Sequence, residues 1–212
     1  HYLAKELIQN IIGLRFSNIM FSSIWNNKYI KCIKISMKET DDVDGRGGYY
    51  EENGVIRDVL QNHLLQVLSL IAMEYPVSLN ADDIRDEKAK VLKYIKPITT
   101  DNTIVGQYIS DGIKPGYTQD KTVNDSSTQI TYVKTVLSIN NPRWSNVPFI
   151  CECGKALNTK SVDIRIQFKS ETNLFNNTLN ELHIRVQPNP EISLLINNKI
   201  PGYNRFNNIN PY

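Results

Sequence analysis

The chain has 212 residues, of which 41% are hydrophobic and 22% are charged, and its formal net charge is +2. A chain of this length buries about two thirds of the surface that its unfolded form exposes, so we expect a hydrophobic core. This net charge is much smaller than the strongly basic charge that is typical of nucleic-acid-binding proteins. No apolar run reaches the roughly 18 residues of a membrane span, and no secretory signal opens the sequence. We therefore expect neither nucleic acid nor a membrane as partner.

Apolar spacing predicts three helices in the first half of the chain. Residues 3–21 and 54–73 carry apolar side chains at helical intervals. A third helix is predicted from Asn80, an N-cap residue that is followed by acidic residues in the first turn. Between the first two helices, residues 33–37 alternate between apolar and polar, which predicts a strand.

The period of the pattern changes from helical to alternating after Pro97. Residues 106–128 predict a polar loop, and residues 131–139, 162–168 and 182–186 then alternate between apolar and polar side chains. This alternation is typical of an antiparallel sheet that is packed on one face only. Helices first and strands later indicate an α+β fold, which we predict to be a large, mainly antiparallel sheet covered on one face by helices.

Three cysteines are present, Cys32, Cys151 and Cys153. Their odd number and irregular spacing favour reduced thiols and a cytoplasmic protein. Cys151 and Cys153 could form half of a metal site, but no second cluster of cysteines and histidines follows them. We therefore predict a structural role for this pair and no metal.

His63 is the strongest single candidate for catalysis. It lies beside the apolar stripe of the predicted second helix, so one interpretation is a histidine that belongs to the core. Polar neighbours such as Asp58 and Asn62 favour the other interpretation, a general base. An imidazole titrates near pH 6.5 and can therefore accept a proton from a hydroxyl group at neutral pH, a step worth about 10²–10⁴ in rate.

Several basic residues could hold an anionic ligand. Lys5 lies at the start of the first predicted helix, close to His1 and Tyr2, and could contact the phosphate of a phosphorylated sugar. Lys155 and Lys160 bracket a turn between two strands. Each of these side chains could equally be solvated, but several that converge on one ligand would form charge-assisted hydrogen bonds of about 1.5–3 kcal/mol each.

Common nucleotide and hydrolase motifs are absent from the sequence. It contains no GxGxxG after a strand, no GxxxxGK[ST], no HExxH and no GxSxG. The glycines at 45, 47 and 48 resemble a nucleotide-binding loop only superficially and predict a flexible turn.

Longer motifs cover almost the whole chain and weaken only in the 109–128 loop and after Glu191. In chain order they are His1-Tyr2-Leu3-Ala4-Lys5-Glu6, Leu14-Arg15-Phe16-Ser17-Asn18, Gly45-Arg46-Gly47-Gly48-Tyr49, Arg57-Asp58-Val59-Leu60-Gln61-Asn62-His63-Leu64-Leu65-Gln66, Arg85-Asp86-Glu87-Lys88, Arg143-Trp144, Gly154-Lys155-Ala156-Leu157-Asn158 and Ile184-Arg185-Val186-Gln187-Pro188-Asn189. Together and in this order, they resemble the glucose-6-phosphate dehydrogenase family.

The resemblance implies a two-domain, NADP-dependent oxidoreductase of the pentose phosphate pathway. Residues 1–212 would form most of the domain that binds glucose 6-phosphate and forms a homodimer or a dimer of dimers through its sheet. We expect the Rossmann-type coenzyme domain and the extreme C-terminus to lie outside the chain, which would be inactive alone. The alternative is a non-catalytic module for sugar-phosphate binding or dimerisation.

The resemblance also implies roles for single residues. His63 would be the general base that takes the proton of the C1 hydroxyl group while a hydride passes to NADP. The substrate contacts that it implies are His1, Tyr2, Lys5, Glu39, Asp58, Lys155, Lys160 and Gln187.

Some positions depart from the family pattern. Ala4 replaces a glycine, and the carboxylate that partners the catalytic histidine falls just before His1. Arg165 and Arg185 match two contacts of a second, structural NADP that some members hold on the sheet. Glu152 replaces another of those contacts, and its charge would repel a phosphate.

Overall fold

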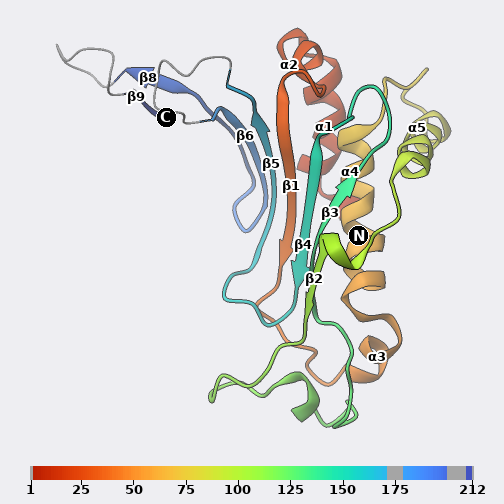
Figure 1. Cartoon of the computed structure of the whole chain (residues 1–212), viewed down its shortest axis with the longest axis vertical. Helices are drawn as coiled ribbons and strands as arrows, with labels where there is room; N and C mark the ends of the chain where they lie inside the picture. Colours follow the sequence, from red (N-terminus) through yellow and green to blue (C-terminus); the bar gives the residue numbers. More distant parts are fainter. Residues whose placement is uncertain (1, 171–178, 200–208, 212) are drawn as a thin grey trace.

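The computed structural model describes residues 2–170, 179–199 and 209–211. A sheet of seven strands is covered by helices on one face, and its other face carries no helix in the described part of the chain (Figure 1). The predicted α+β fold with a sheet packed on one side is therefore confirmed.

The strands have an order that differs from their order in the sequence. Across the sheet they are β2 (Thr103–Gly106), β3 (Tyr132–Ser138), β4 (Pro148–Gly154), β1 (Ile30–Lys38), β5 (Ser161–Phe168), β6 (Glu181–Gln187) and β7 (Glu191–Leu195). All neighbours are antiparallel except β1 and β4, which run parallel in the middle of the sheet. A separate ladder joins β8 (Asn197–Lys199) to β9 (Ile209–Pro211).

Strand β3 illustrates why the sheet has one covered face. Val133, Thr135 and Leu137 are buried under the helices, whereas Lys134 and Ser138 are exposed on the open face. Successive side chains of a strand point to opposite faces, so the alternation in the sequence becomes a division between core and solvent.

The helical elements follow the prediction with two changes. They are η1 (Tyr2–Ala4), α1 (Glu6–Phe16), α2 (Ile19–Ile24), α3 (Gly47–Val55), η2 (Ile56–Leu64), α4 (Leu65–Ala72), α5 (Ala81–Tyr94) and the short turns η3 (Thr100–Asn102) and η4 (Tyr117–Gln119). The predicted first helix is interrupted, because Asn18 donates its side-chain N–H to the carbonyl of Leu14 at 3.1 Å and so ends α1. The predicted second helix starts earlier and consists of three segments.

The end of α4 is held by three buried side chains. Arg15, Trp25 and Trp144 donate hydrogen bonds of 2.7–2.8 Å to the carbonyls of residues 70–73. Carbonyls at a helix end have no partner within the helix, so these bonds satisfy them inside the core. This arrangement ties α1, α2 and the segment before β4 to the helix that carries the candidate site.

The cysteines belong to the core. Cys32, Cys151 and Cys153 are free and buried, and the latter two lie on β4 with their side chains in the hydrophobic core, in agreement with the predicted structural role. Among the described residues, no cluster of histidine, cysteine and acidic side chains could hold a metal ion.

None of the described helices is long and apolar enough to cross a membrane.

Candidate active site

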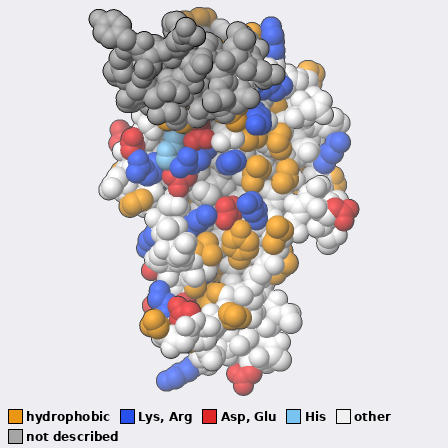
Figure 2. Space-filling model, turned by 60° about the vertical axis from the view of Figure 1, so that its left-hand side comes forward, with side chains coloured by type: hydrophobic (Ala, Val, Ile, Leu, Met, Phe, Trp, Pro, Cys, Tyr) orange, Lys and Arg blue, Asp and Glu red, His pale blue; other side chains and the backbone are white. Residues whose placement is uncertain are grey.

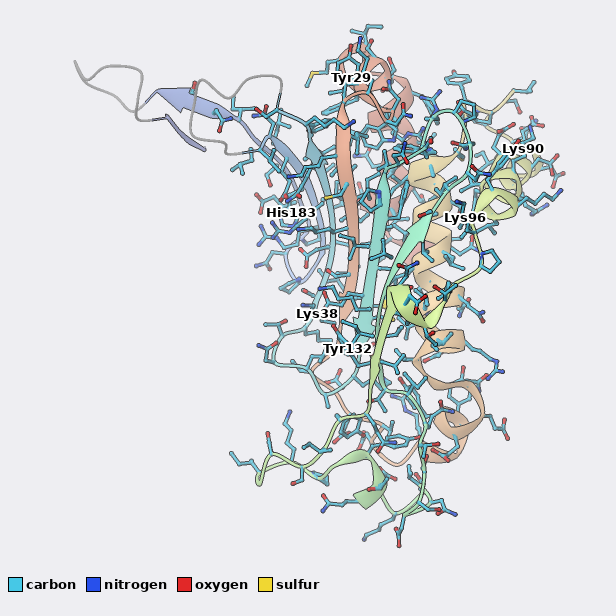
Figure 3. The ribbon with its side chains drawn as sticks, viewed as in Figure 1. Tyr29, Lys38, Lys90, Lys96, Tyr132 and His183 are labelled. Atoms are coloured by element: carbon cyan, nitrogen blue, oxygen red, sulfur yellow. The ribbon has the colours of Figure 1, made fainter. Side chains whose placement is uncertain are left out.

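Four of the predicted substrate contacts lie at one end of the sheet. Glu39 follows the last residue of β1 and Lys155 follows the last residue of β4, and these two strands are parallel and in register up to that point. Strand β5 runs the other way, so Lys160, just before its first residue, reaches the same end. Gln187 is the last residue of β6 and pairs with the beginning of β5. Figure 3 labels Lys38, the last residue of β1, at this end of the sheet.

Glu39 and Lys155 form a partly buried ion pair. The Lys155 ammonium lies 2.6 Å from Oε2 of Glu39, and Lys155 is only 8% exposed. The ammonium also lies 5.7 Å from the ring centroid of Tyr50, a cation–π contact. A buried ammonium needs such partners because it has lost most of its water. The pair therefore holds Lys155 in one position at the end of the sheet.

Asp58 and His63 are both carried by η2, whose hydrogen bonding differs from that of an α-helix. The N–H of Leu65 donates to the carbonyl of Leu60, five residues earlier, which is π-helical pairing. Residues that share a face of an α-helix are three or four apart. The wider π turn brings Asp58 and His63, which are five apart, closer to a common face than an α-helix would.

His63 is half-buried, so it is not enclosed in the core. Burial lowers the pKa of its imidazole below the ordinary value, and the negative charge of Asp58 opposes part of this shift. The neutral form, which can accept a proton, therefore predominates at neutral pH. This environment favours the general base over the interpretation as a core histidine.

Asp58 and Lys155 border the same small cavity. It has a volume of about 40 Å³, and its walls are Val43, Arg46, Tyr49, Tyr50, Asp58 and Lys155. The hydroxyl of Tyr49 donates to Oδ1 of Asp58 at 3.2 Å. Arg46, Tyr49 and Tyr50 were not singled out as site residues from the sequence, where their segment predicted only a flexible turn. Their position beside Gly47 and Gly48, the glycines that start α3, was the available signal.

A model of the family described as "Glucose-6-phosphate dehydrogenase, C-terminal domain" matches residues 12–210. The chain belongs to this family.

Individual glucose-6-phosphate dehydrogenases agree with this assignment. Glucose-6-phosphate 1-dehydrogenase of Dictyostelium discoideum is 50% identical over 208 residues, which are 95% of this chain and 42% of that protein. The chloroplastic glucose-6-phosphate 1-dehydrogenase 3 of Arabidopsis thaliana is 49% identical over 215 residues, or 95% of this chain and 36% of that protein. The chain thus spans about two fifths of the length of these relatives.

The fold is also that of a solved glucose-6-phosphate dehydrogenase in complex with its substrate glucose-6-phosphate. The two structures agree with a TM-score of 0.93 at 44% sequence identity, over all of this chain and 44% of the other. The described residues contain no Rossmann-type domain, because their large sheet is mainly antiparallel.

The N-terminal contacts that the glucose-6-phosphate dehydrogenase family implies are placed only in part. Lys5 directly precedes α1, and its side chain is exposed. His1 lies outside the described residues, and so does the side chain of Tyr2. Leu3 borders the same hollow of about 560 Å³ as Gln66, three residues after His63, so this segment lies beside the start of α4.

Lys160 and Gln187 lie at the rim of the site. The ammonium of Lys160 is 2.7 Å from Oδ2 of Asp41, and both side chains are exposed. The hydrogen bond from Lys160 lowers the pKa of Asp41. Gln187 is half-buried at the end of β6. The Lys160–Asp41 pair is therefore more exposed to solvent than the Glu39–Lys155 pair.

The open face of the sheet carries Arg165 and Arg185, the two residues that match contacts of a second NADP. Arg165 lies 2.8 Å from the carboxylate of Glu181, and Arg185 forms an ion pair with Glu191. Basic, acidic and hydrophobic side chains are mixed over the part of this view that is not grey (Figure 2). A phosphate group would have to displace a carboxylate from each guanidinium, and Glu152 would repel it. The described residues of this face therefore do not fit a second NADP.

Proposed function

We propose that the full-length protein containing this chain is a glucose-6-phosphate dehydrogenase. It would oxidise D-glucose 6-phosphate at C1 to 6-phospho-D-glucono-1,5-lactone and supply NADPH in the oxidative pentose phosphate pathway. The observation that carries this proposal is the position of His63, half-buried on η2 and close to the charge of Asp58, on the helix that borders the sheet end with Lys155.

The reaction needs a base and a hydride acceptor. His63 takes the proton of the C1 hydroxyl group while the C1–H bond breaks and a C1=O bond forms. The hydride acceptor would be supplied by NADP, which a coenzyme domain outside this chain would hold. A half-buried imidazole with a lowered pKa is neutral at physiological pH and is therefore ready to accept this proton.

The remaining contacts orient the sugar phosphate. Lys5, with His1 and Tyr2, would bind the phosphate at one end of the substrate, since an exposed ammonium is free to contact a dianion. Glu39 and Asp58 would accept hydrogen bonds from sugar hydroxyl groups. Lys155, Lys160 and Gln187 would donate from the end of the sheet. The close Glu39–Lys155 pair supports this assignment, because it fixes a donor beside an acceptor.

The open face of the sheet is the surface through which we propose that two copies associate, as a homodimer or a dimer of dimers. Its paired charges and the exposed Val136 on β3 are compatible with contact between protein surfaces.

The three buried thiols favour a cytoplasmic location over an oxidising compartment.

The direct test is an assay of the full-length protein with glucose 6-phosphate and NADP. We expect NADPH to appear in equal amount with the lactone, and no reaction with free glucose at the same concentration. Binding of glucose 6-phosphate without any NADPH would instead support the non-catalytic module. The absence of both binding and turnover would contradict the proposal in either form.

A further inference from the structure

One tyrosine of the candidate site has an unsatisfied hydroxyl group. Tyr50, on α3, is 2% exposed, and its hydroxyl oxygen is buried without a hydrogen-bond partner among the described residues. A buried hydroxyl that makes no hydrogen bond is destabilising, so such groups are rare and call for an explanation. Tyr50 also borders the cavity of about 40 Å³ that Asp58 and Lys155 share.

The neighbouring tyrosines all have partners. Tyr49 donates to Asp58 at 3.2 Å, Tyr117 donates to Glu51 at 2.5 Å, and the hydroxyl of Tyr108 accepts from the backbone N–H of Val43 at 3.3 Å. The ring of Tyr117 packs edge-on against that of Tyr50, with centroids 6.0 Å apart. The unsatisfied hydroxyl is therefore particular to the tyrosine that lies between this aromatic cluster and the candidate site.

The surroundings of the Tyr50 hydroxyl keep it protonated. Burial raises its pKa, and so do the nearby Cys153 and the carboxylates of Asp58 and Glu39. The phenol is therefore neutral and can donate one hydrogen bond and accept others. The two carboxylates are those proposed to bind sugar hydroxyl groups, so the free donor belongs to the same site.

We propose that Tyr50 is a further substrate-positioning residue, whose hydroxyl group bonds to the oxygen atom that occupies this cavity when the sugar phosphate is bound. The cavity has room for about one oxygen-sized group, since a water molecule takes up about 30 Å³ of liquid. That oxygen is either a hydroxyl group of the sugar or a single water molecule that the bound sugar phosphate encloses in the cavity. The proposal rests on the proposed function.

The test compares Tyr50→Phe with the matched control Tyr117→Phe in the full-length protein. Both changes remove one phenol oxygen from the same aromatic cluster. Tyr50→Phe deletes a group without a partner, so the melting temperature of the ligand-free protein should stay equal or rise. Its KM for glucose 6-phosphate should rise about three- to tenfold, the effect of one lost hydrogen bond. Tyr117→Phe breaks the bond to Glu51, so it should lower the melting temperature and leave KM unchanged.

Deoxy analogues of the substrate distinguish the two sources of the oxygen. If Tyr50 contacts the sugar directly, the KM ratio of variant to wild type should fall to about 1 for the one deoxyglucose 6-phosphate that lacks the contacted hydroxyl. If a water molecule fills the cavity, the ratio should be the same for every analogue. An unchanged KM for glucose 6-phosphate in Tyr50→Phe would overturn the proposal.

The melting temperatures provide a test that needs no activity. A loss of stability in ligand-free Tyr50→Phe as large as that of Tyr117→Phe would also overturn the proposal, because the hydroxyl would then have a partner without substrate. A wild-type protein that does not oxidise glucose 6-phosphate would instead overturn the proposed function.

Discussion

The ammonium of Lys155 lies 2.6 Å from the carboxylate of Glu39, and these residues directly follow β4 and β1, two parallel strands in register. Parallel strands bring their carboxyl ends to the same edge, and this geometry joins two residues that are far apart in the sequence. The pair positions a donor and an acceptor on a rigid part of the fold, and the first prediction depends on it.

Replacement of Lys155 by alanine should affect substrate binding far more than the same change at Lys160. Lys155 is 8% exposed and held by Glu39, so its loss removes a positioned, charge-assisted hydrogen bond of about 1.5–3 kcal/mol and should raise KM about 10–100-fold. Lys160 is exposed beside Asp41, and its loss should raise KM less than about fivefold. Steady-state kinetics of the two full-length variants would check this order, and equal effects would contradict it.

The pH dependence of kcat/KM should report the environment of His63. The base acts in its neutral form, so the rate falls as the pH drops through the pKa of the imidazole. Because burial lowers this pKa, the acid limb should lie below the ordinary value of about 6.5. Asp58 raises the same pKa, so Asp58→Asn should move the limb to still lower pH while reducing the overall rate. A limb that stays in place or moves to higher pH in Asp58→Asn would show that Asp58 does not act on His63.

Arg15 should be among the residues that stabilise the fold most. Its guanidinium donates 2.7 Å hydrogen bonds to the carbonyls of Leu70 and Met73 at the end of α4. Arg15→Met keeps the volume but leaves both carbonyls unsatisfied, at a cost of about 1–3 kcal/mol each. We expect a melting temperature lower by at least about 4 °C in the full-length protein. The exposed Arg85→Met serves as a control, and equal shifts for both variants would contradict this role.

A second NADP should not bind through Arg165 and Arg185. Both guanidiniums are already paired with carboxylates, so replacing them by alanine should leave the NADP-induced rise in melting temperature unchanged. We expect the coenzyme domain that we propose for the full-length protein to account for that rise in both proteins. A smaller rise in the double variant, measured by thermal unfolding at several NADP concentrations, would show that the open face does bind the coenzyme.

Much of the fold could be predicted from the sequence because its periodicity is local. The alternation of residues 162–168 and the N-cap at Asn80 correspond to β5 and the start of α5. The parallel pairing of β4 with β1 could not be predicted, because it depends on contacts between strands more than a hundred residues apart. The π-helical pairing of η2 was also hidden, since its apolar spacing fits an ordinary helix.

The candidate site, like the fold, could be predicted from the sequence only in part. Single residues such as His63 and Lys155 could be named from the motifs that resemble the family. Their relation to one another could not, because the Glu39–Lys155 pair and the cavity wall at Tyr50 form only when strand ends and α3 meet. A buried hydroxyl without a partner has no signature in the sequence at all.

The most direct measurement is the turnover of His63→Asn in the full-length protein, beside the control His183→Asn. His183 lies on the open face of the sheet, 2.8 Å from Asp163 and outside the candidate site. We predict that His63→Asn lowers kcat about 10²–10⁴-fold with little change in glucose 6-phosphate affinity, and that His183→Asn leaves kcat within about twofold. A His63→Asn variant that keeps more than about a tenth of the wild-type kcat would contradict the assignment of His63 as the base.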